Sequence, residues 1–335
     1  MLRKNARLSP ATRRERAHTC VRAKTYPVKH RPGNQHISLE SSANRLTLSM
    51  SLQFGQVKLP APAKLNLMLH VTGRRADGYH NLQTLFHFLD YCDELTFSSR
   101  DDGEIVLRPS LEGVDDSHNL IYRAAKLLQR ESSTTLGADI DVTKRIPMGG
   151  GLGGGSSDAA TTLIGLNKLW RTGLAKDRLQ SLSLTLGADV PIFVFGRSSW
   201  AEGVGDILTP VEIPEQWYVV IAPSCHVSTA LVFSHADLDR NTPATTLESA
   251  LKHGGLNDCQ SLVVKLYPEV LKCLQWLEQH GKAQMTGTGS CVFAAFPTHE
   301  KAQEVFAQLP EGMDGFVSRG LNLSPVYQTG IVSFN

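Results

Sequence analysis

The chain has 335 residues, of which 41% are hydrophobic and 20% are charged. These values are typical of a globular protein and exclude a disordered or collagen-like chain, and the length favours two domains. No apolar run approaches the roughly 20 residues that a transmembrane helix needs. The six cysteines are scattered and form no Cys-x-x-Cys pair, so we expect reduced, structural thiols in the cytoplasm. The twelve histidines show no metal-ligand spacing.

Positive charge is concentrated near the N-terminus. Residues 1–49 contain eleven Lys and Arg and two acids, whereas the rest of the chain has a net charge of −7. We expect 1–49 to be a disordered extension, and three interpretations are open: a transit peptide for a plastid-type organelle, a basic arm for an anionic surface, or upstream sequence of an over-long gene model with Met50 as the true start. We favour the last, because folded-looking sequence begins near Met50. The mildly acidic remainder predicts no nucleic-acid partner.

Short apolar runs and turn signals predict the elements of the first half. Strands are expected at 57–59, 65–71, 86–89, 94–98 and 140–144, with Pro-Ala-Pro-Ala separating the first two. Asp101-Asp102-Gly103 predicts a hairpin turn into a strand at 104–108. Ser117 is expected to cap a helix that ends at Arg130. Two further helices are expected, one directly after a glycine run at 149–155 and one over 177–186.

Pro210, Pro214 and a loss of pattern around them predict a boundary between a domain at 50–212 and a second at 213–335. In the second domain we expect strands at 218–221, 292–296 and 315–319, and helices at 229–233, 270–280 and, capped by Thr298, up to Gln308. Strands and helices alternate without the regular rhythm of a doubly wound sheet, so the predicted fold class is α+β.

The glycine run at 149–155 ends in Ser156-Ser157-Asp158 and leads into a helix. Glycine N–H groups and a helix N-terminus together predict a cradle for phosphate. The run lacks the Gly-Lys-Ser/Thr ending of a Walker A loop. Gly149-x-Gly151-x-x-Gly154 matches a dinucleotide fingerprint, so a nicotinamide-dependent dehydrogenase is the alternative, although the polar helical segment that follows does not suit it. A binding module without activity is a third possibility.

The run resembles the phosphate-binding motif of the galactokinase, homoserine kinase, mevalonate kinase and phosphomevalonate kinase (GHMP) superfamily. Three further segments, Ala61-Pro62-Ala63-Lys64-Leu65-Asn66-Leu67, Arg75-Ala76-Asp77-Gly78-Tyr79-His80 and Leu186-Gly187-Ala188-Asp189-Val190-Pro191, resemble the 4-diphosphocytidyl-2-C-methyl-D-erythritol kinases, as does Thr286-Gly287-Thr288-Gly289-Ser290. The resemblance covers about 50–325. It implies a small-molecule kinase that phosphorylates the 2-hydroxyl of this cytidine diphosphate substrate with ATP and Mg²⁺, in the non-mevalonate route to isoprenoids.

The resemblance also implies the fold and the site. The fold would have a ribosomal protein S5 domain 2-like N-terminal domain, a ferredoxin-like C-terminal domain and an active site in the cleft between them. Lys64 and Asp189 match the catalytic residues. The residues implied to bind ATP are Pro147, Met148, Gly149, Gly150, Gly151, Leu152, Gly153, Gly154, Gly155, Ser156, Ser157 and Asn119. Those implied to bind the substrate are Asn66, Tyr79, His80, Thr229 and Phe233. The oligomeric state and the magnesium ligands stay open.

Several of these residues have a second interpretation. Asp189 has the alternative of an N-cap before Val190-Pro191, and Lys64 that of a solvated surface residue. For Asp158 we favour helix capping over metal binding through water, because a carboxylate close to phosphates would repel them. Either Ser156 or Ser157 can reach a phosphate or the magnesium ion, and the sequence does not choose between them. The 286–290 segment is expected either to close over the ligands or to form a tight turn before a strand.

Overall fold

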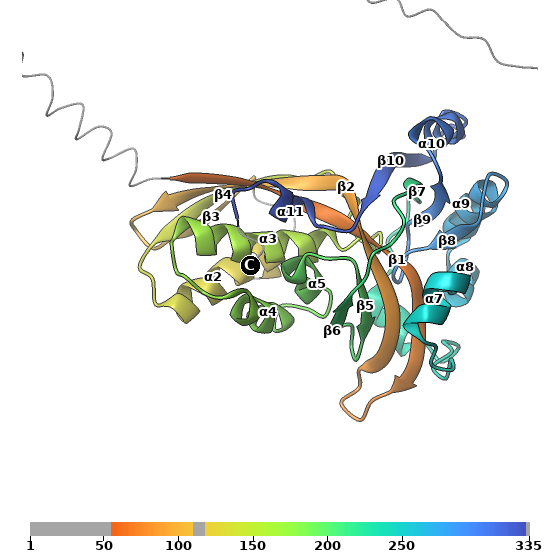
Figure 1. Ribbon diagram of the computed structural model, residues 1–335, viewed down its shortest axis with the longest axis horizontal. Coiled ribbons are helices and arrows are strands. Elements are labelled where there is room, and N and C mark those ends of the chain that lie inside the picture. The colour runs from red at the N-terminus through yellow and green to blue at the C-terminus, as the bar shows by residue number, and fades with distance from the viewer. Residues whose placement is uncertain (1–54, 110–117, 333–335) are drawn as a thin grey trace, which may run out of the picture. The chain divides into compact units, whose positions relative to one another are not determined.

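The computed structural model describes residues 55–109 and 118–332, all within one compact unit. The expectations for 1–49 lie outside the described residues. Ten strands form one connected sheet, with β3-β4-β2-β10-β7-β9-β8 as its main path, β1 paired to β2, and β5 joining β2 to β6 (Figure 1). The strands are β1 (Gln56–Arg74), β2 (His80–Arg100), β3 (Ile105–Arg108), β4 (Gly137–Thr143), β5 (Ser199–Glu202), β6 (Ile207–Pro210), β7 (Trp217–Ala222), β8 (Ala283–Met285), β9 (Val292–Phe296) and β10 (Asp314–Leu321).

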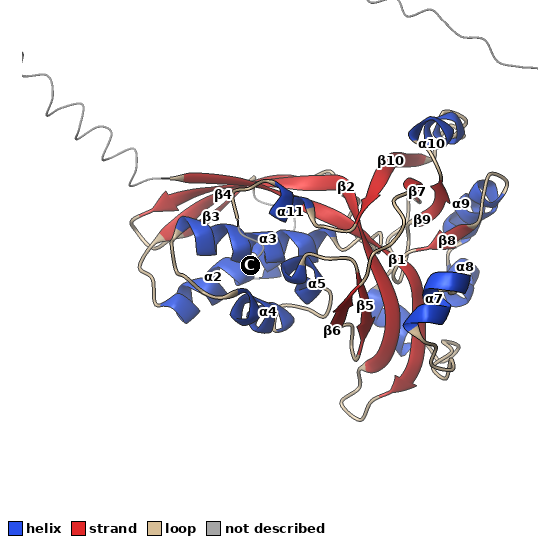
Figure 2. Cartoon of the chain, viewed as in Figure 1, coloured by secondary structure: helices blue, strands red, loops and turns tan. Residues whose placement is uncertain are grey.

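The helices form two groups beside this sheet. In Figure 2, α2 to α5 gather below β2, β3 and β4, whereas α8, α9 and α10 lie beside β7 to β9. The helices are α2 (Leu120–Ser132), α3 (Gly154–Leu169), α4 (Lys176–Leu184), α5 (Val190–Phe195), α6 (Thr229–Ser234), α7 (Leu247–His253), α8 (Gln260–Leu266), α9 (Pro268–Glu278), α10 (His299–Phe306) and α11 (Pro325–Gln328). Only β3 and β4 pair in parallel among the described strands, so the predicted α+β class is confirmed.

The first two strands are longer than predicted. The expected strands at 57–59 and 65–71 are one strand, β1, and those at 86–89 and 94–98 are one strand, β2. Pro60 and Pro62 do not interrupt β1, because its only ladder is with β2 and an edge strand tolerates residues that lack an N–H donor. The register of that ladder shifts at three places, one of them between Pro62 and Lys64.

Two local predictions in the first half are wrong. The strand after Asp101-Asp102-Gly103 does not form a hairpin with β2; instead β3 pairs in parallel with β4, which itself lies next to β2. The N-cap of α2 is Asn119, whose side-chain oxygen accepts from the N–H of Ile121 at 2.9 Å. Ser117, the expected cap, lies outside the described residues.

Most of the other expected elements are confirmed within a few residues: β4, α3, α4, β7, α6, α9, β9, α10 and β10. Thr298 caps α10, since its hydroxyl accepts from the N–H of Lys301. Not predicted were β5, β6, α5, α7, α8, β8 and α11, which are short and show little periodicity.

One strand contributes to all four buried clusters of the described chain. Leu59 of β1 packs with α2, α3 and α5, and Leu65 lies in a central cluster with Tyr218. Further along, Met68 packs with Trp200, and Leu69 belongs to the cluster built mainly from 219–305.

The domain boundary at 212/213 stays a prediction. Among the described helices, none combines the length and apolar character needed to cross a bilayer.

We expect Gly165→Ala to destabilise the fold. A Cβ on Gly165 of α3 would lie 2.5 Å from the buried Phe97 ring of β2. Overpacking of this kind costs about 1–3 kcal/mol, which outweighs the roughly 1 kcal/mol that Ala gains over Gly in a helix. Denaturant unfolding measures the loss.

Gly187→Ala is the matched control for this substitution. Its Cβ would meet Val190 at an ordinary 3.5 Å, so the free energy of unfolding should change by less than about 0.5 kcal/mol. Equal stability of both variants and the wild type would contradict the packing argument.

Candidate active site

The glycine run forms a tight loop between β4 and α3. Gly149, Gly151 and Gly153 have φ angles of 68°, 76° and 74°, in the left-handed region that favours glycine. A Cβ on Gly151 would also lie 2.2 Å from the carbonyl oxygen of Thr286. The loop therefore requires glycine both for its backbone conformation and for a close approach of a second loop.

That second loop is 286–290. The N–H of Cys291 donates to the carbonyl of Gly150 at 3.0 Å, and the N–H of Ser290 donates to that of Gly149 at 3.3 Å. From the other side, the amide of Asn257 donates to the carbonyl of Gly287 at 2.7 Å. The segment thus makes the expected turn before β9, and it is also hydrogen-bonded to the first glycine loop.

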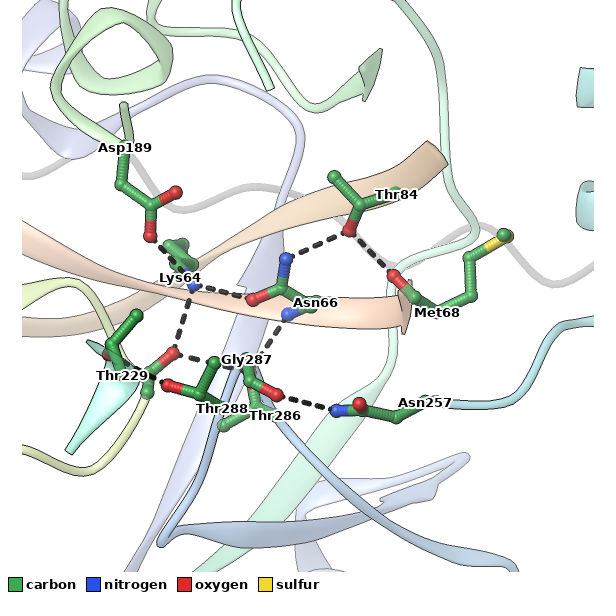
Figure 3. A network of polar contacts seen from close by, with 11 residues as sticks. Lys64, Asn66, Met68, Thr84, Asp189, Thr229, Asn257, Thr286, Gly287 and Thr288 are labelled. Carbon is green, nitrogen blue, oxygen red and sulfur yellow. Dashed lines mark hydrogen bonds and ion pairs between the residues drawn. The ribbon is translucent and has the colours of Figure 1, made fainter. Parts of the chain in front are cut away.

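The ammonium of Lys64 lies where β1, the glycine loop and α5 meet (Figure 3). The side chain is 2% exposed, and the ammonium contacts Asn66 Oδ1 at 2.5 Å, the Gly151 carbonyl at 3.0 Å and Asp189 Oδ2 at 3.4 Å. A buried ammonium is stable only with such partners. The alternative of a solvated surface lysine is therefore wrong.

Asp189 precedes α5 without capping it by its side chain. The structure gives no hydrogen bond from this carboxylate to the first turn of α5. The side chain is 42% exposed and pairs with Lys64. Asp189 therefore presents a carboxylate both to a buried cation and to open space, which a capping role would not require.

A cavity of about 580 Å³ opens in front of Lys64 and Asp189. Of the residues expected to bind ATP, all but one line it, together with His118, Lys144, Gly287 and Thr288. The exception is Ser157, which is fully buried, whereas Ser156 faces the cavity. Between the two serines, the structure thus offers Ser156 to a ligand. Asn66 lines this cavity as well.

A second hollow of about 500 Å³ adjoins the first and shares Thr229 and Phe233 with it. It brings together Tyr79, His80, Thr229 and Phe233, four of the five residues expected to bind substrate. The His80 ring stacks on that of Phe233, with centroids 5.2 Å apart. Tyr79 is 62% exposed at the rim.

His80 is held as a neutral imidazole. Burial, followed by the charges of Arg240 and Arg74, lowers the pKa of His80 below its usual 6.5. The guanidinium of Arg240 donates to His80 Nε2 at 3.0 Å and is itself fixed by the carbonyls of Phe233, His235 and Leu238. Because Nε2 accepts, the ring hydrogen lies on Nδ1, which gives His80 one defined donor.

Asp158 does not cap α3, contrary to the sequence-based expectation. The helix begins with Gly153 at its N-cap, and Asp158 lies in its second turn. Its carboxylate is buried and pairs with the Lys144 ammonium at 2.6 Å, and the same ammonium contacts Asp93. Burial opposes the charge on Lys144, but Asp158 and Asp93 outweigh it and raise the pKa of Lys144.

Sequence reasoning missed Lys144, Arg240 and Asn257. Lys144 lines the cavity, Arg240 fixes His80, and Asn257 holds the second loop. Each acts through partners far away in the sequence, so no local spacing marks it. Of these three residues, only Lys144 could have been suspected from the sequence, because it lies just before the glycine run.

The topology excludes the dinucleotide alternative. A dinucleotide fingerprint requires a βαβ unit with parallel strands on both sides of its helix. Here β4 pairs antiparallel to β2, and α3 is followed by α4 rather than by a strand. The glycine spacing that suggested a dehydrogenase is therefore accidental.

Family models agree with this reading of the fold. The model for the N-terminal domain of GHMP kinases matches residues 119–197, and that for the GHMP kinase C-terminal domain matches residues 236–315. At the level of the fold alone, a homoserine kinase from Cytophaga hutchinsonii superposes with a TM-score of 0.55 at 18% identity, covering 81% of this chain and 96% of its own. The fold and the site define a GHMP kinase.

Sequence relatives identify the family within the GHMP kinases to which the chain belongs. A 4-diphosphocytidyl-2-C-methyl-D-erythritol kinase of Ectopseudomonas mendocina is 57% identical over 81% of this chain and 93% of its own. One of Shewanella loihica is 53% identical over 80% and 94%. A crystal structure of 4-(cytidine 5'-diphospho)-2C-methyl-D-erythritol kinase superposes with a TM-score of 0.70 at 33% identity, covering 79% and 99%. The chain belongs to the 4-diphosphocytidyl-2-C-methyl-D-erythritol kinase family.

We expect Thr286→Val to weaken the attachment of the second glycine loop to β1. The Thr286 hydroxyl accepts from the N–H of Asn66 at 2.9 Å, and both residues are buried. Leaving that N–H without an acceptor costs about 1–3 kcal/mol of stability. Thr286→Ser keeps the hydroxyl and serves as the control. Denaturant unfolding should show a larger loss for Val than for Ser, and equal losses would contradict the assignment.

Proposed function

We propose that the protein transfers the γ-phosphoryl group of ATP to the 2-hydroxyl of 4-diphosphocytidyl-2-C-methyl-D-erythritol, giving the 2-phosphate and ADP for isoprenoid precursor synthesis. The observation that carries this proposal is the buried Lys64 ammonium, which contacts both the glycine loop and the Asp189 carboxylate at one end of the cavity. Phosphoryl transfer needs such an arrangement, because positioning and charge stabilisation supply most of the rate enhancement.

In the proposed mechanism, Asp189 accepts the hydrogen bond of the acceptor hydroxyl and takes its proton as the O–P bond forms. Lys64 contacts Asp189 at 3.4 Å and offsets negative charge on the phosphoryl group in transit. The ammonium is already fixed by Asn66 and Gly151. Little reorganisation is then needed during the reaction.

ATP is proposed to lie along the glycine loop. The N–H groups of the loop and of the first turn of α3 suit the phosphates, and Ser156 adds a hydroxyl from the cavity wall. Asn119 lines the same cavity at the start of α2 and is proposed to lie near the adenine. Its side-chain oxygen caps the helix, which leaves its NH₂ group for the base.

Magnesium is proposed to arrive with ATP. The described residues contain no group of three His, Cys, Asp or Glu side chains that could hold a metal ion. This suits Mg²⁺, which keeps several waters and binds mainly through substrate phosphates. When bound, the ion would neutralise phosphate charge, and Asp189, a carboxylate in the cavity wall, would hold it through water.

The cytidine end is proposed to occupy the second hollow. Tyr79 and Phe233 would stack on the cytosine ring, and the Nδ1–H of His80 would donate to an acceptor on the base edge. Asn66 and Thr229 lie in the first cavity, and Thr229 also lines the second, so both are proposed to contact the part between base and hydroxyl.

Two further expectations become proposals. The two matched segments, 119–197 and 236–315, lie on either side of the 212/213 boundary and support it. The scattered cysteines, of which the five described are free, support a cytoplasmic enzyme.

Substitution of either catalytic residue should remove most of the turnover. Lys64→Met keeps the volume of a side chain that is 2% exposed, and Asp189→Asn keeps the shape of the carboxylate. Loss of a positioned base costs roughly 10²–10⁴-fold, and we expect a comparable loss for Lys64. A coupled assay for ADP with ATP, Mg²⁺ and the cytidine substrate measures it.

Lys58→Met is the control on the same strand, because Lys58 forms an exposed pair with Glu94. It should leave turnover unchanged. Near-normal turnover in both Lys64→Met and Asp189→Asn would contradict the proposed mechanism. Absence of ADP release by the wild type would contradict the proposed reaction itself.

The double variant Tyr79→Ala, Phe233→Ala should weaken binding of the cytidine substrate. Base stacking on an aromatic ring is worth about 1–3 kcal/mol, so we expect the KM for the cytidine substrate to rise at least about tenfold while the KM for ATP barely changes. Steady-state kinetics separate the two constants. An unchanged KM for the cytidine substrate would remove these rings from the site.

A further inference from the structure

Three ionisable groups form a buried cluster in the wall of the first cavity. Asp93 comes from β2, Asp158 comes from α3, and Lys144 directly follows β4. Their side chains are 0%, 22% and 4% exposed. Lys144 and Asp158 line the cavity itself. The proposed mechanism uses none of the three.

The two carboxylates of this cluster are unequally supported. Asp93 accepts from the N–H groups of Arg145 and Ile146 through one oxygen and from Lys144 through the other. Asp158 accepts from Lys144 through Oδ2 only, while its Oδ1 is buried without a hydrogen-bond partner among the described residues. A buried carboxylate oxygen without a donor is costly, so Asp158 is the member of the pair that more readily takes a proton.

The local electrostatics agree with this difference. Burial raises the pKa of Asp158 to about 7, Lys144 opposes this, and Asp93 adds to it. The other elements packed against α3 also carry ionisable groups: Lys64 on β1, Arg123 on α2 with His118 just before it, Lys176 and Asp177 on α4, and Asp189 before α5. None of these is among the charges that shift Asp158.

The cluster has a net charge of −1 when both carboxylates are ionised and is neutral when Asp158 is protonated. We propose that nucleotide binding shifts Asp158 toward its protonated form by uptake of a proton from solvent, so that the cavity wall next to the polyphosphate becomes neutral. One O–H bond forms on the Asp158 carboxylate, and one bond to hydrogen breaks in the hydronium ion or buffer acid that supplies the proton. This inference rests on the proposed function only in that a nucleotide must occupy the first cavity.

Proton uptake makes nucleotide affinity depend on pH. Phosphate charge near Asp158 disfavours its ionised form, so the bound state holds the proton to a higher pH than the free state. Affinity therefore falls as pH rises through the pKa of Asp158, by up to about tenfold for each pKa unit that the nucleotide adds. Asp158→Asn fixes a neutral side chain of the same shape and removes this dependence.

Calorimetry on the full chain tests the proposal with MgADP as the probe. At pH 7.5, in buffers of different ionisation enthalpy, the wild type should take up a measurable fraction of a proton more than Asp158→Asn does. At pH 8.5 the variant should bind MgADP several-fold more tightly than the wild type, and at pH 6 the two should be equal. Because the ligand is the same, its own titration cancels.

Asp141→Asn is the matched control, since Asp141 is an exposed carboxylate on β4. It should take up as many protons as the wild type. Equal uptake by the wild type and Asp158→Asn, or weaker binding by Asp158→Asn at pH 8.5, would overturn the proposal while leaving the kinase function intact. A wild type that does not bind MgADP would instead overturn the proposed function, and this inference with it.

Carbon-13 NMR of the wild-type aspartate carboxyls decides the question if Asp158→Asn fails to fold. The Asp158 carboxyl should titrate near neutrality in the free protein and at a higher pH with MgADP bound. A titration that MgADP leaves in place or moves to lower pH would overturn the proposal.

Discussion

The candidate site depends on the burial of one ammonium group, that of Lys64. An ion taken out of water must find its partners within the protein, and these partners come from separate elements: Asn66 from β1, Gly151 from the glycine loop and Asp189 from the turn before α5. Asn66 extends the connection, since its amide donates to Thr84 of β2 and its N–H to Thr286 of the second loop. Fixing one charge therefore fixes strand, loops and helix relative to one another.

A second ammonium, that of Lys144, is 22% exposed and has different partners. Lys64 has one half-exposed carboxylate and two neutral oxygens, whereas Lys144 has two buried carboxylates. The cavity wall thus has a balanced charge pair, Lys64 with Asp189, where the chemistry is proposed. Beside α2 and the start of α3, the two carboxylates around Lys144 leave an excess of negative charge. The same physical rule, that buried charges need partners, produces a fixed charge at one end and a group that can change its protonation at the other.

Sequence reasoning reached the parts of this arrangement that local patterns encode. Apolar periodicity and caps such as Thr298 gave most helices, and the positive φ angles of the 149–155 loop explain why its glycines were visible as a motif. Pro60 and Pro62 misled the prediction of β1, because their tolerance on an edge strand depends on which neighbours the strand has. The partners of Asp158 and His80 could not be predicted from the sequence for a similar reason. Lys144 and Asp93 become neighbours of Asp158, and Arg240 becomes a neighbour of His80, only through the tertiary fold.

The continuity of β1 restricts how the cavity can open. One strand places Leu59, Leu65, Met68 and Leu69 in four different buried clusters, and its ladder with β2 runs the whole way. A rotation of one cluster against another must therefore bend a paired strand instead of turning a flexible linker. Two of the three register shifts in that ladder lie beside Lys64 and Asn66. An opening motion that bends β1 at these shifts would move the residues that hold the buried ammonium, so access to the cavity and the alignment of its charges would then change together.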